Sequence, residues 1–202
     1  MIGIINYGVG NLRSVENALN FLNIPNTIIG KPVEIKKCNK LILPGVGAFG
    51  PAIKKLNELG FAKEFIRFGG QKPILGICLG MQLLFEESCE YGHHKGLGLI
   101  KGKVLPFSKK IKKLPLPLIG WNEIKTKRKS PLLQDISNDA AFYFVHSFYC
   151  EPTDKSVILA STDYGIKFAS IINKNNIYGC QFHPEKSQSA GLKILENFNK
   201  LI

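Results

Sequence analysis

Long apolar runs are missing from this chain of 202 residues. A membrane-spanning helix needs about 20 consecutive, mostly apolar residues, and no stretch of the sequence reaches that length. A signal peptide would begin with a basic segment followed by a longer apolar stretch and a small-residue cleavage site. Residues 1–5 instead have the composition of a strand. We therefore expect a cytoplasmic protein with no membrane partner.

Closely spaced cysteines are missing as well. The five cysteines are an odd number and lie far apart, and the sequence has neither a Cys-x-x-Cys pair nor a Cys/His cluster with metal-ligand spacing. Disulfide frameworks and zinc sites both depend on such spacings. The sequence therefore predicts reduced thiols, no metal site and no cofactor.

Acidic residues are few, since 15 of them stand against 27 lysines and arginines and the formal net charge is +12. Much of the positive charge lies in two lysine-rich runs, residues 109–113 and 125–129. Neither run carries the interleaved aromatic side chains on which single-stranded nucleic acids stack. Solvated loop faces are thus the favoured interpretation, and no nucleic-acid partner is expected. A basic surface could also steer an anionic substrate or an acidic partner protein.

The first half of the chain alternates short apolar runs with amphipathic stretches. This rhythm is typical of βαβ units, which build a parallel sheet covered by helices on both faces. The expected strands are residues 2–6, 27–29, 40–43 and 74–77, and the expected helices are residues 11–22, 51–68 and 81–85.

The sequence pattern changes after residue 92. From there on, turn residues separate short apolar runs, which predicts hairpins and meander strands. These runs are residues 96–104, 119–124, 141–150, 157–161, 169–172 and 177–182, and a final helix is expected at 191–201. No repeat or long linker interrupts the chain. The sequence predicts an α/β fold of three layers, a mostly parallel central sheet with helices on both faces and added antiparallel strands in the second half, in a single domain of residues 1–202.

Cys78 lies in Gly-Ile-Cys-Leu-Gly at residues 76–80, between an apolar run and an amphipathic stretch. A strand that reverses sharply into a helix needs residues without side chains two positions before and after the nucleophile, and Gly76 and Gly80 meet that need. The turn would lift the sulfur to a helix N-terminus, where free N–H groups favour the thiolate. Alone, a cysteine in an apolar run is more often a core residue. The surrounding pattern favours a nucleophile.

A thiol nucleophile needs a base, and the base needs an orienting carboxylate. His183 is the best of the four histidines, because it ends a strand and Glu185 follows two residues later, on the same side of an extended segment. His146 lies in an aromatic strand and is also compatible with a core position. His93 and His94 lie in a polar loop and read as solvated.

The segment Gly-Val-Gly-Ala-Phe-Gly at residues 45–50 matches a dinucleotide-binding pattern. We reject that interpretation, because a proline opens the loop and the expected helix begins after the third glycine. Loops at the carboxyl ends of adjacent parallel strands converge on one crevice. The backbone of this loop could therefore present N–H groups to an oxyanion beside Cys78, with the N–H of Leu79 as a further donor.

Five blocks of the chain resemble, in order, those of the class I (triad) glutamine amidotransferases. They are Pro-Gly-Val-Gly-Ala-Phe-Gly at residues 44–50, Gly-Ile-Cys-Leu-Gly-Met-Gln-Leu-Leu at 76–84, Gly-Trp-Asn at 120–122, Tyr-Phe-Val-His-Ser at 143–147 and Gln-Phe-His-Pro-Glu-Lys-Ser at 181–187. The opening Tyr-Gly-Val-Gly-Asn at 7–11 and the length are similar, more narrowly, to the glutaminase subunits of imidazole glycerol phosphate synthases. The resemblance covers essentially the whole chain.

This resemblance implies hydrolysis of L-glutamine to glutamate and ammonia through a cysteine thioester. Cys78 would attack the side-chain amide, His183 would protonate the leaving ammonia and Glu185 would orient His183. The remaining implied residues are the oxyanion donors Val46, Gly47 and Leu79, and the glutamine-binding residues Gly47, Gln82, Ser147 and Phe148. Ammonia would then pass, within a heterodimer, to a (β/α)8-barrel cyclase subunit that makes imidazole glycerol phosphate in histidine biosynthesis.

The resemblance also implies a partner interface at Leu118, Gly120, Trp121 and Asn122. One position departs from the family. A histidine commonly precedes this block in the family, whereas this chain has Leu118, whose side chain can neither donate nor accept a hydrogen bond. Three alternatives stay open: a paralogous subunit that feeds ammonia to a sugar in surface-polysaccharide biosynthesis, a binding subunit without catalytic activity, and a thiol peptidase or γ-glutamyl hydrolase built on the same elbow.

Overall fold

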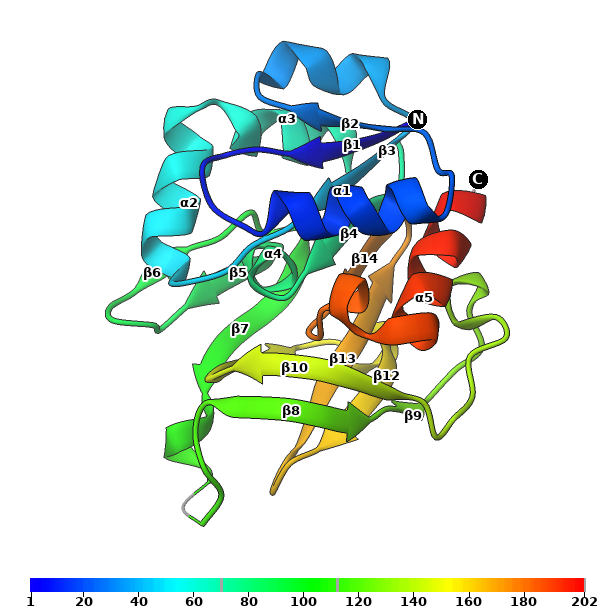
Figure 1. The fold of residues 1–202 in the computed structure, drawn as a ribbon. Coiled ribbons are helices and arrows are strands. Elements are labelled where there is room, and N and C mark those ends of the chain that lie inside the picture. Colours follow the sequence, from blue (N-terminus) through cyan, green and yellow to red (C-terminus); the bar gives the residue numbers. More distant parts are fainter. Residues whose placement is uncertain (70, 112, 202) are drawn as a thin grey trace.

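The computed structural model describes residues 1–69, 71–111 and 113–201, so Lys112 of the first lysine-rich run lies outside the described residues. Its main element is an eight-stranded sheet (Figure 1). In spatial order, the strands are β2 (Asn26–Ile29), β1 (Ile2–Ile5), β3 (Lys40–Leu43), β4 (Ile74–Ile77), β14 (Ile177–Cys180), β13 (Lys167–Lys174), β12 (Ile158–Asp163) and β9 (Lys125–Thr126).

The first five strands of this order, β2 to β14, run parallel, and β13, β12 and β9 extend the sheet antiparallel. Parallel strands buried on both faces read as near-continuous apolar runs, and β1 and β4 are buried along their whole lengths. The predicted α/β class and mostly parallel sheet are confirmed. Because β14 pairs with β4, the segments that follow these two strands, which contain His183 and Cys78, begin side by side.

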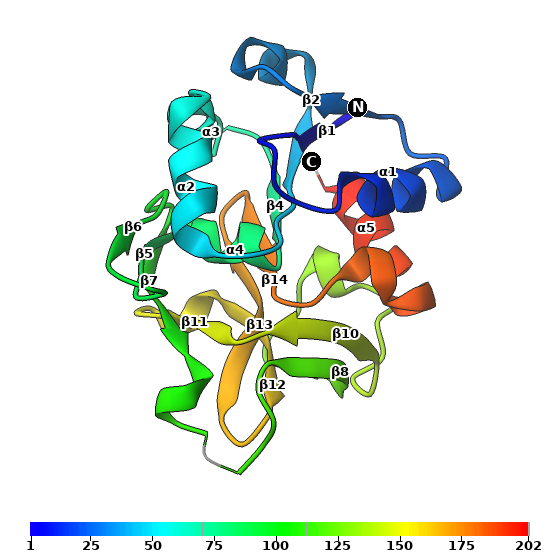
Figure 2. The same ribbon diagram turned by 60° about the vertical axis from the view of Figure 1, so that its left-hand side comes forward.

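Helices cover both faces of the parallel strands (Figure 2). On one side lie α1 and α5, and on the other lie α2 and α3. The helix bounds are α1 (Leu12–Phe21), α2 (Phe49–Glu58), α3 (Phe61–Phe68), α4 (Leu79–Leu83) and α5 (Gln188–Lys200). Short 3₁₀ helices occur at Pro32–Lys37, Phe107–Lys109, Pro131–Leu133, Lys155–Val157 and Pro184–Lys186.

The two faces of the sheet carry separate hydrophobic cores, because successive side chains of a strand point to opposite faces. Ile4 and Ile42 belong to the core that includes α1 and α5, whereas Ile5 and Leu43 belong to the core that includes α2 and α3. The three predicted layers follow from this alternation.

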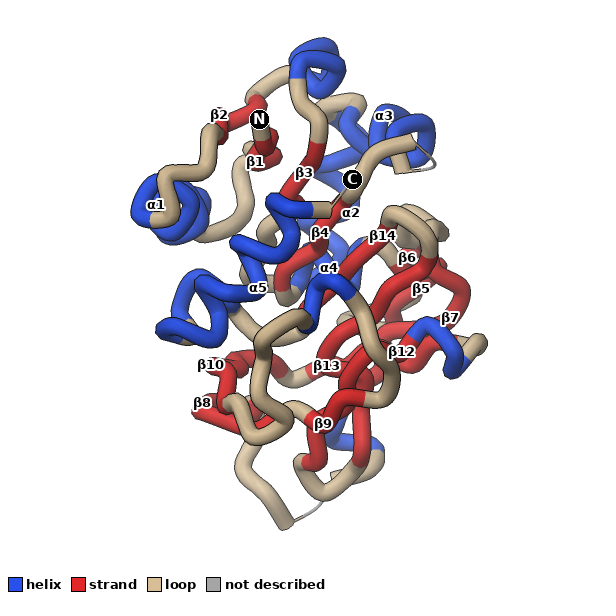
Figure 3. Tube along the Cα trace, turned by 90° about the vertical axis from the view of Figure 1, so that its right-hand side faces the viewer, coloured by secondary structure: helices blue, strands red, loops and turns tan. Residues whose placement is uncertain are grey.

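In the view of Figure 3, two smaller sheets lie to the left and to the right of the antiparallel strands of the main sheet. β8 (Leu118–Glu123) pairs with β10 (Ala141–His146), and β11 (Phe148–Pro152), β7 (Ile100–Pro106), β5 (Phe85–Ser88) and β6 (His94–Lys95) form a four-stranded sheet. Within the described residues no helix is long and apolar enough to cross a membrane.

Three predicted elements were wrong in detail. The helix expected at 51–68 is two helices, because Gly60 adopts φ +78° and breaks it. The helix expected at 81–85 begins earlier, at Leu79, and is followed by β5. The single run 141–150 is two strands that separate at Ser147, since β10 and β11 join different sheets.

Candidate active site

Cys78 lies at the turn from β4 into α4, with φ +54° and ψ −110°. A non-glycine residue with positive φ is uncommon and is held in place by its surroundings. Here the N–H of Cys78 donates to the carbonyl oxygen of Cys180 at 2.8 Å, which fixes the turn to β14. Its Sγ lies 3.9 Å from the carbonyl oxygen of Val145 and 3.8 Å from Nε2 of Gln181. The sharp strand–turn–helix geometry expected around Cys78 is therefore present.

The two glycines of this turn leave no room for a side chain. A Cβ on Gly76 would lie 2.7 Å from the backbone of Gly80, and a Cβ on Gly80 would overlap the carbonyl oxygen of Leu43. Real Cβ atoms do not approach so closely, and the neighbouring atoms belong to the backbone and cannot swing away. Glycine at both positions is a steric requirement of the turn.

His183 follows β14, the strand beside β4, so it reaches the same edge of the sheet as Cys78. Its Nδ1 lies 2.8 Å from Oε1 of Glu185, and the two side chains are only 3% and 1% exposed. The geometry differs from the extended segment expected here, because Pro184–Lys186 is a 3₁₀ turn. The pair is further held by the N–H of His183, which donates to the carbonyl oxygen of Tyr143 at 2.9 Å.

The charge of His183 is set by its two neighbours. Burial alone lowers the pKa of the imidazole, but the contacts with Cys78 and Glu185 outweigh burial and raise the pKa to about 10. The Nε2 atom is buried and forms no hydrogen bond of standard geometry with the described residues. Cys78 therefore lies close enough to His183 to raise the pKa of the imidazole, and catalytic contacts of this kind commonly tighten when substrate binds.

A cavity of about 290 Å³ lies over Cys78. Most of the residues singled out from the sequence line it, and Glu185 lies behind His183. The lining residues are Val46, Gly47, Cys78, Leu79, Gln82, Glu90, Pro117, Val145, His146, Ser147, Phe148 and His183. This volume is near the lower end of the range for small-molecule sites.

Gln82 forms one wall of the cavity and is tied to the segment that follows β10. Its Nε2 donates to the carbonyl oxygen of Phe148 at 3.1 Å. His146 donates from Nδ1 to the same carbonyl at 2.8 Å, and burial lowers its pKa to about 4 although that hydrogen bond opposes the shift. His146 is therefore a neutral, buried residue that fixes the backbone at Ser147 and Phe148.

The expected oxyanion donors lie around the sulfur. Leu79 is the first residue of α4, where backbone N–H groups have no intrahelical partner. In the described part of the chain, neither its N–H nor those of Val46 and Gly47 form a hydrogen bond. Gly47 has φ +89° and nothing within 4 Å of a Cβ position, so glycine is needed there for backbone conformation and not for space.

Glu90 lines the cavity and was missed by sequence reasoning. Its Oε2 accepts a hydrogen bond from the N–H of Phe49 at 2.7 Å, at the first residue of α2. The carboxylate thereby anchors the helix that follows the loop containing Val46 and Gly47. No motif surrounds this glutamate in the sequence, so only the tertiary contact reveals it.

The residues expected at a partner interface divide between the two faces of the β8–β10 ribbon. Leu118 is fully buried and faces the core, so its side chain is not available to a partner. The outer face carries Ile119 and Trp121, which are 62% and 47% exposed. Trp121 packs edge-on against Tyr143, its register partner, with ring centroids 6.1 Å apart.

The other two histidines lie apart from the cavity. His93 Nε2 is 2.6 Å from Oε2 of Glu87 at the surface, and His94 packs against Phe49. Among the described residues no group of three or more His, Cys, Asp or Glu side chains could hold a metal ion.

A cysteine and a histidine at one cavity, with a glutamate hydrogen-bonded to the histidine, on a mostly parallel α/β sheet, agree with the comparison with known families. The model of the class-I glutamine amidotransferases matches residues 4–201. The chain belongs to this family.

Curated relatives give a narrower similarity. The imidazole glycerol phosphate synthase subunit HisH of Caldanaerobacter subterraneus subsp. tengcongensis is 49% identical, over 100% of this chain and 98% of that protein. The subunit of the same name from Chlorobium luteolum is 48% identical, over 98% of both chains. That from Desulfitobacterium hafniense is 46% identical, over 100% of this chain and 95% of that protein.

Solved structures of more distant proteins share the fold. PurLQS from Thermotoga maritima has a TM-score of 0.78 at 17% identity, over 98% of this chain and 96% of that chain. A structure described as a glutamine amidotransferase has a TM-score of 0.76 at 19% identity, over 98% of each chain. At these identities the likeness concerns the fold alone.

Proposed function

We propose that this chain is the glutaminase subunit of imidazole glycerol phosphate synthase and hydrolyses L-glutamine to glutamate and ammonia in histidine biosynthesis. The observation that carries the proposal is the buried His183–Glu185 pair beside Cys78 in one cavity, in a chain 46–49% identical to curated HisH subunits over nearly its full length. Such a pathway fits a cytoplasmic enzyme. Because the family match spans residues 4–201, we treat residues 1–202 as one amidotransferase domain.

The first half of the reaction forms a thioester. The thiolate of Cys78 attacks the side-chain amide carbon of glutamine, and the carbonyl electron pair moves onto oxygen. Backbone N–H groups of Val46, Gly47 and Leu79 would bind this oxyanion. The C–N bond then breaks as protonated His183 gives its Nε2 proton to the leaving nitrogen, and ammonia is released.

The second half regenerates the enzyme. Water attacks the thioester carbon while its proton passes to Nε2 of His183, and the C–S bond breaks to return the thiolate of Cys78. The product acid loses its proton to solvent and leaves as glutamate. Glu185 holds the imidazole through Nδ1 in both halves of the reaction.

Recognition of glutamine follows from the walls of the cavity. Backbone groups at Gly47, Ser147 and Phe148 together with the side chain of Gln82 supply neutral hydrogen-bonding partners. Among the described residues that line the cavity, Glu90 carries the one carboxylate, and we assign it to the α-ammonium group of the substrate. One of its oxygens already accepts a hydrogen bond from the N–H of Phe49. Phe49 follows the loop that contains Val46 and Gly47, so substrate binding and the position of that loop are connected.

Ammonia would pass to a (β/α)8-barrel cyclase subunit in a heterodimer. The exposed Ile119 and Trp121 support docking at the β8–β10 ribbon, and Gly120 and Asn122 lie on the same strand. Val145 at the end of this ribbon also lines the cavity, so the docking face is continuous with the catalytic site. A closed contact there would keep ammonia away from water, in which it is mostly protonated and non-nucleophilic.

The test is to assay glutamate and imidazole glycerol phosphate formation with the purified chain, alone and with a barrel cyclase. We expect glutamine-dependent product only with both subunits. A chain that hydrolyses glutamine but supports only a sugar-modifying synthase would contradict the pathway. A chain without hydrolysis under any condition would contradict the catalytic role.

A further inference from the structure

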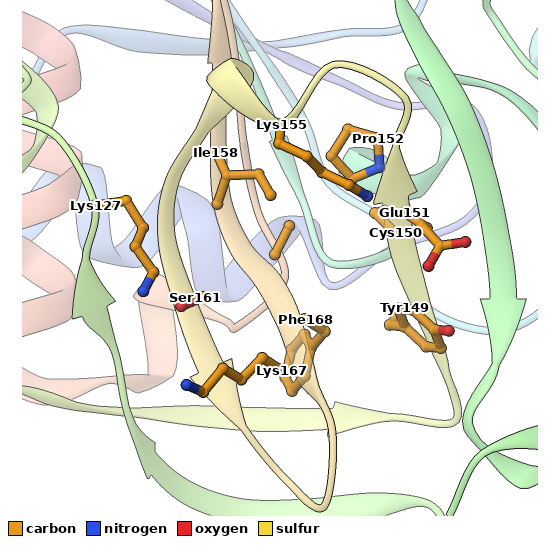
Figure 4. Close-up of a pocket in the computed structure, with 11 residues that line it drawn as sticks. Lys127, Tyr149, Cys150, Glu151, Pro152, Lys155, Ile158, Ser161, Lys167 and Phe168 are labelled. Atoms are coloured by element: carbon orange, nitrogen blue, oxygen red, sulfur yellow. The ribbon is translucent and has the colours of Figure 1, made fainter.

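A second cavity, of about 380 Å³, lies on the strand-rich half of the molecule, away from Cys78. Residues 148–152 of β11 connect the two sites, because Phe148 lines the catalytic cavity and the next four residues line the second one. Figure 4 shows the side chains around it, from β11 on one side and β12 and β13 on the other. They are Lys127, Tyr149, Cys150, Glu151, Pro152, Lys155, Ile158, Ser161, Lys167, Phe168 and Ala169.

The apolar lining of the second cavity comes from both hydrophobic cores. Tyr149 and Phe168 belong to one core, and Cys150 and Ala169 belong to the other. Ile158 packs against the second of these cores. A ligand seated here would meet hydrocarbon and aromatic carbon on its inner side.

The rim of the cavity is cationic. Within the described residues, the ammonium groups of Lys127, Lys155 and Lys167 form no ion pair or hydrogen bond. The rim's one acid, Glu151, is already paired with Lys110, 3.2 Å away. Asp163 lies opposite Lys167 in the β12–β13 ladder but does not line the cavity. The rim therefore keeps an excess of positive charge.

A neutral hydroxyl completes the polar edge. Ser161 is the register partner of Ala169, and Lys167 precedes Ala169 by two residues, so the three side chains share one face of the sheet. Ser161 lines the cavity and makes no side-chain hydrogen bond to any described residue. Figure 4 shows Lys127 and Lys167 on the Ser161 side and Lys155 on the other.

We propose that this second cavity binds a small amphipathic anion, with its apolar body on the floor of residues 149, 150, 158, 168 and 169 and its carboxylate or phosphate at Lys127, Lys167 and Ser161. Lysine suits such a head group as a compact point charge. The proposal also gives a role to part of the lysine-rich runs: Lys127 of the second run lines the cavity, and Lys110 of the first run lies over the ring of Tyr149, one of the lining residues.

The test is calorimetric titration of the full chain with octanoate, 1-octanol and inorganic phosphate. Octanoate carries both the apolar body and the negative charge, whereas octanol lacks the charge and phosphate lacks the body. We expect one octanoate to bind per chain, at least about tenfold more tightly than either control, which corresponds to about 1.4 kcal/mol. Equal binding of octanol, or no binding of octanoate at millimolar concentration, would overturn the proposal.

Variants locate the binding site. The double variant Lys127→Gln/Lys167→Gln should weaken octanoate binding about tenfold. The matched pair Lys63→Gln/Lys101→Gln removes the same charge from exposed positions outside the cavity and should leave binding unchanged. A loss no larger than that of the matched pair would contradict the assignment.

Competition separates this cavity from the catalytic one. Titration of Cys78→Ala protein saturated with glutamine should give the same octanoate affinity as without glutamine, because the two cavities share no lining residue. Displacement of octanoate by glutamine would place it over Cys78 and overturn the second site. Ala169→Leu, which fills the floor, should abolish octanoate binding while the protein keeps its cooperative unfolding transition.

Discussion

Nδ1 of His183 and Oε1 of Glu185 are 2.8 Å apart and almost completely shielded from water. In such surroundings a charge-assisted hydrogen bond holds the imidazole in one tautomer and one orientation. It leaves Nε2 as the ring atom that faces the sulfur of Cys78. The orientation of this imidazole therefore depends on a carboxylate that does not itself line the cavity.

Replacing Glu185 with Gln should lower turnover with little effect on KM. The amide keeps the shape of the side chain but removes the charge that orients the imidazole, and we expect kcat to fall by a factor of about 10 to 10⁴. Steady-state glutamate formation measures both constants. Glu196→Gln, at a half-buried position of α5 that does not line the cavity, is the matched control. Full activity in the Glu185 variant would exclude this residue from the triad.

Replacing Cys78 with Ala should abolish glutamine-dependent synthesis by the complex but leave ammonia-dependent synthesis largely intact. In the proposed function, the thiol serves only to release ammonia, and ring closure belongs to the partner. Product formation with either nitrogen source is the measurement. If added ammonium failed to restore synthesis, the proposed division of labour between the subunits would be wrong.

Replacing Gly80 with Ala should destabilise the fold by about 3 kcal/mol or more, a range reserved for backbone clashes and lost core packing. The added methyl group overlaps the carbonyl oxygen of Leu43. Gly30→Ala is the control, because nothing lies within 4 Å of a Cβ there and φ is not positive. Thermal or urea unfolding compares the two variants, and equal midpoints would contradict the steric account.

Stability should fall with acidification partly through His146. Burial lowers its pKa from 6.5 to about 4 in the folded protein. Between these values the unfolded chain binds more protons, so the free energy of unfolding rises with pH there and is lost as pH falls toward 4. The loss is on the order of 3 kcal/mol. His146→Asn keeps a donor for Phe148 but cannot titrate, so urea unfolding at pH 4 to 7 should show a shallower decline. Parallel curves would refute the prediction.

Replacing Trp121 with Ala should reduce stimulation by the partner more than the basal glutaminase rate. The indole lies on the outer face of the β8–β10 ribbon, and Val145 of the same ribbon lines the cavity. A partner bound at this face could therefore bring an oxyanion donor into position, which is worth about 10² to 10³ in rate. Glutamine hydrolysis with and without the liganded cyclase measures the ratio. Phe21→Ala removes another exposed aromatic side chain, on α1, and should leave it unchanged. A basal rate equal to the rate with the liganded cyclase would contradict activation by the partner.

Local signals were enough to predict the parallel half of the fold. The strands at 40–43 and 74–77 were predicted with their observed bounds, because buried parallel strands are short apolar runs. The break at Gly60 was missed, since a glycine inside an amphipathic pattern does not reveal its φ. The break at Ser147 depends on which sheet each strand joins, and this is a tertiary property.

The site was predictable where it rests on short motifs and unpredictable where it rests on distant contacts. Cys78 and His183 stand in distinctive sequences, and the structure places both at one cavity. Glu90 belongs to no sequence motif, and its place at the cavity is revealed only by the structure, in which it accepts a hydrogen bond from Phe49. The inward orientation of Leu118 follows from the register of β8 against β10, which the sequence does not display.

The place of β14 between β4 and β13 has a consequence for biosynthesis on the ribosome. Cys78 is translated about a hundred residues before His183, and β14, the strand just before His183, must insert into the middle of the sheet. A nascent chain shorter than residue 177 therefore lacks both His183 and the carbonyl of Cys180 that holds the cysteine turn. Such unfinished chains contain the residues of the cysteine turn without the histidine, so the cavity over Cys78 is complete only after β14 and His183 have been made.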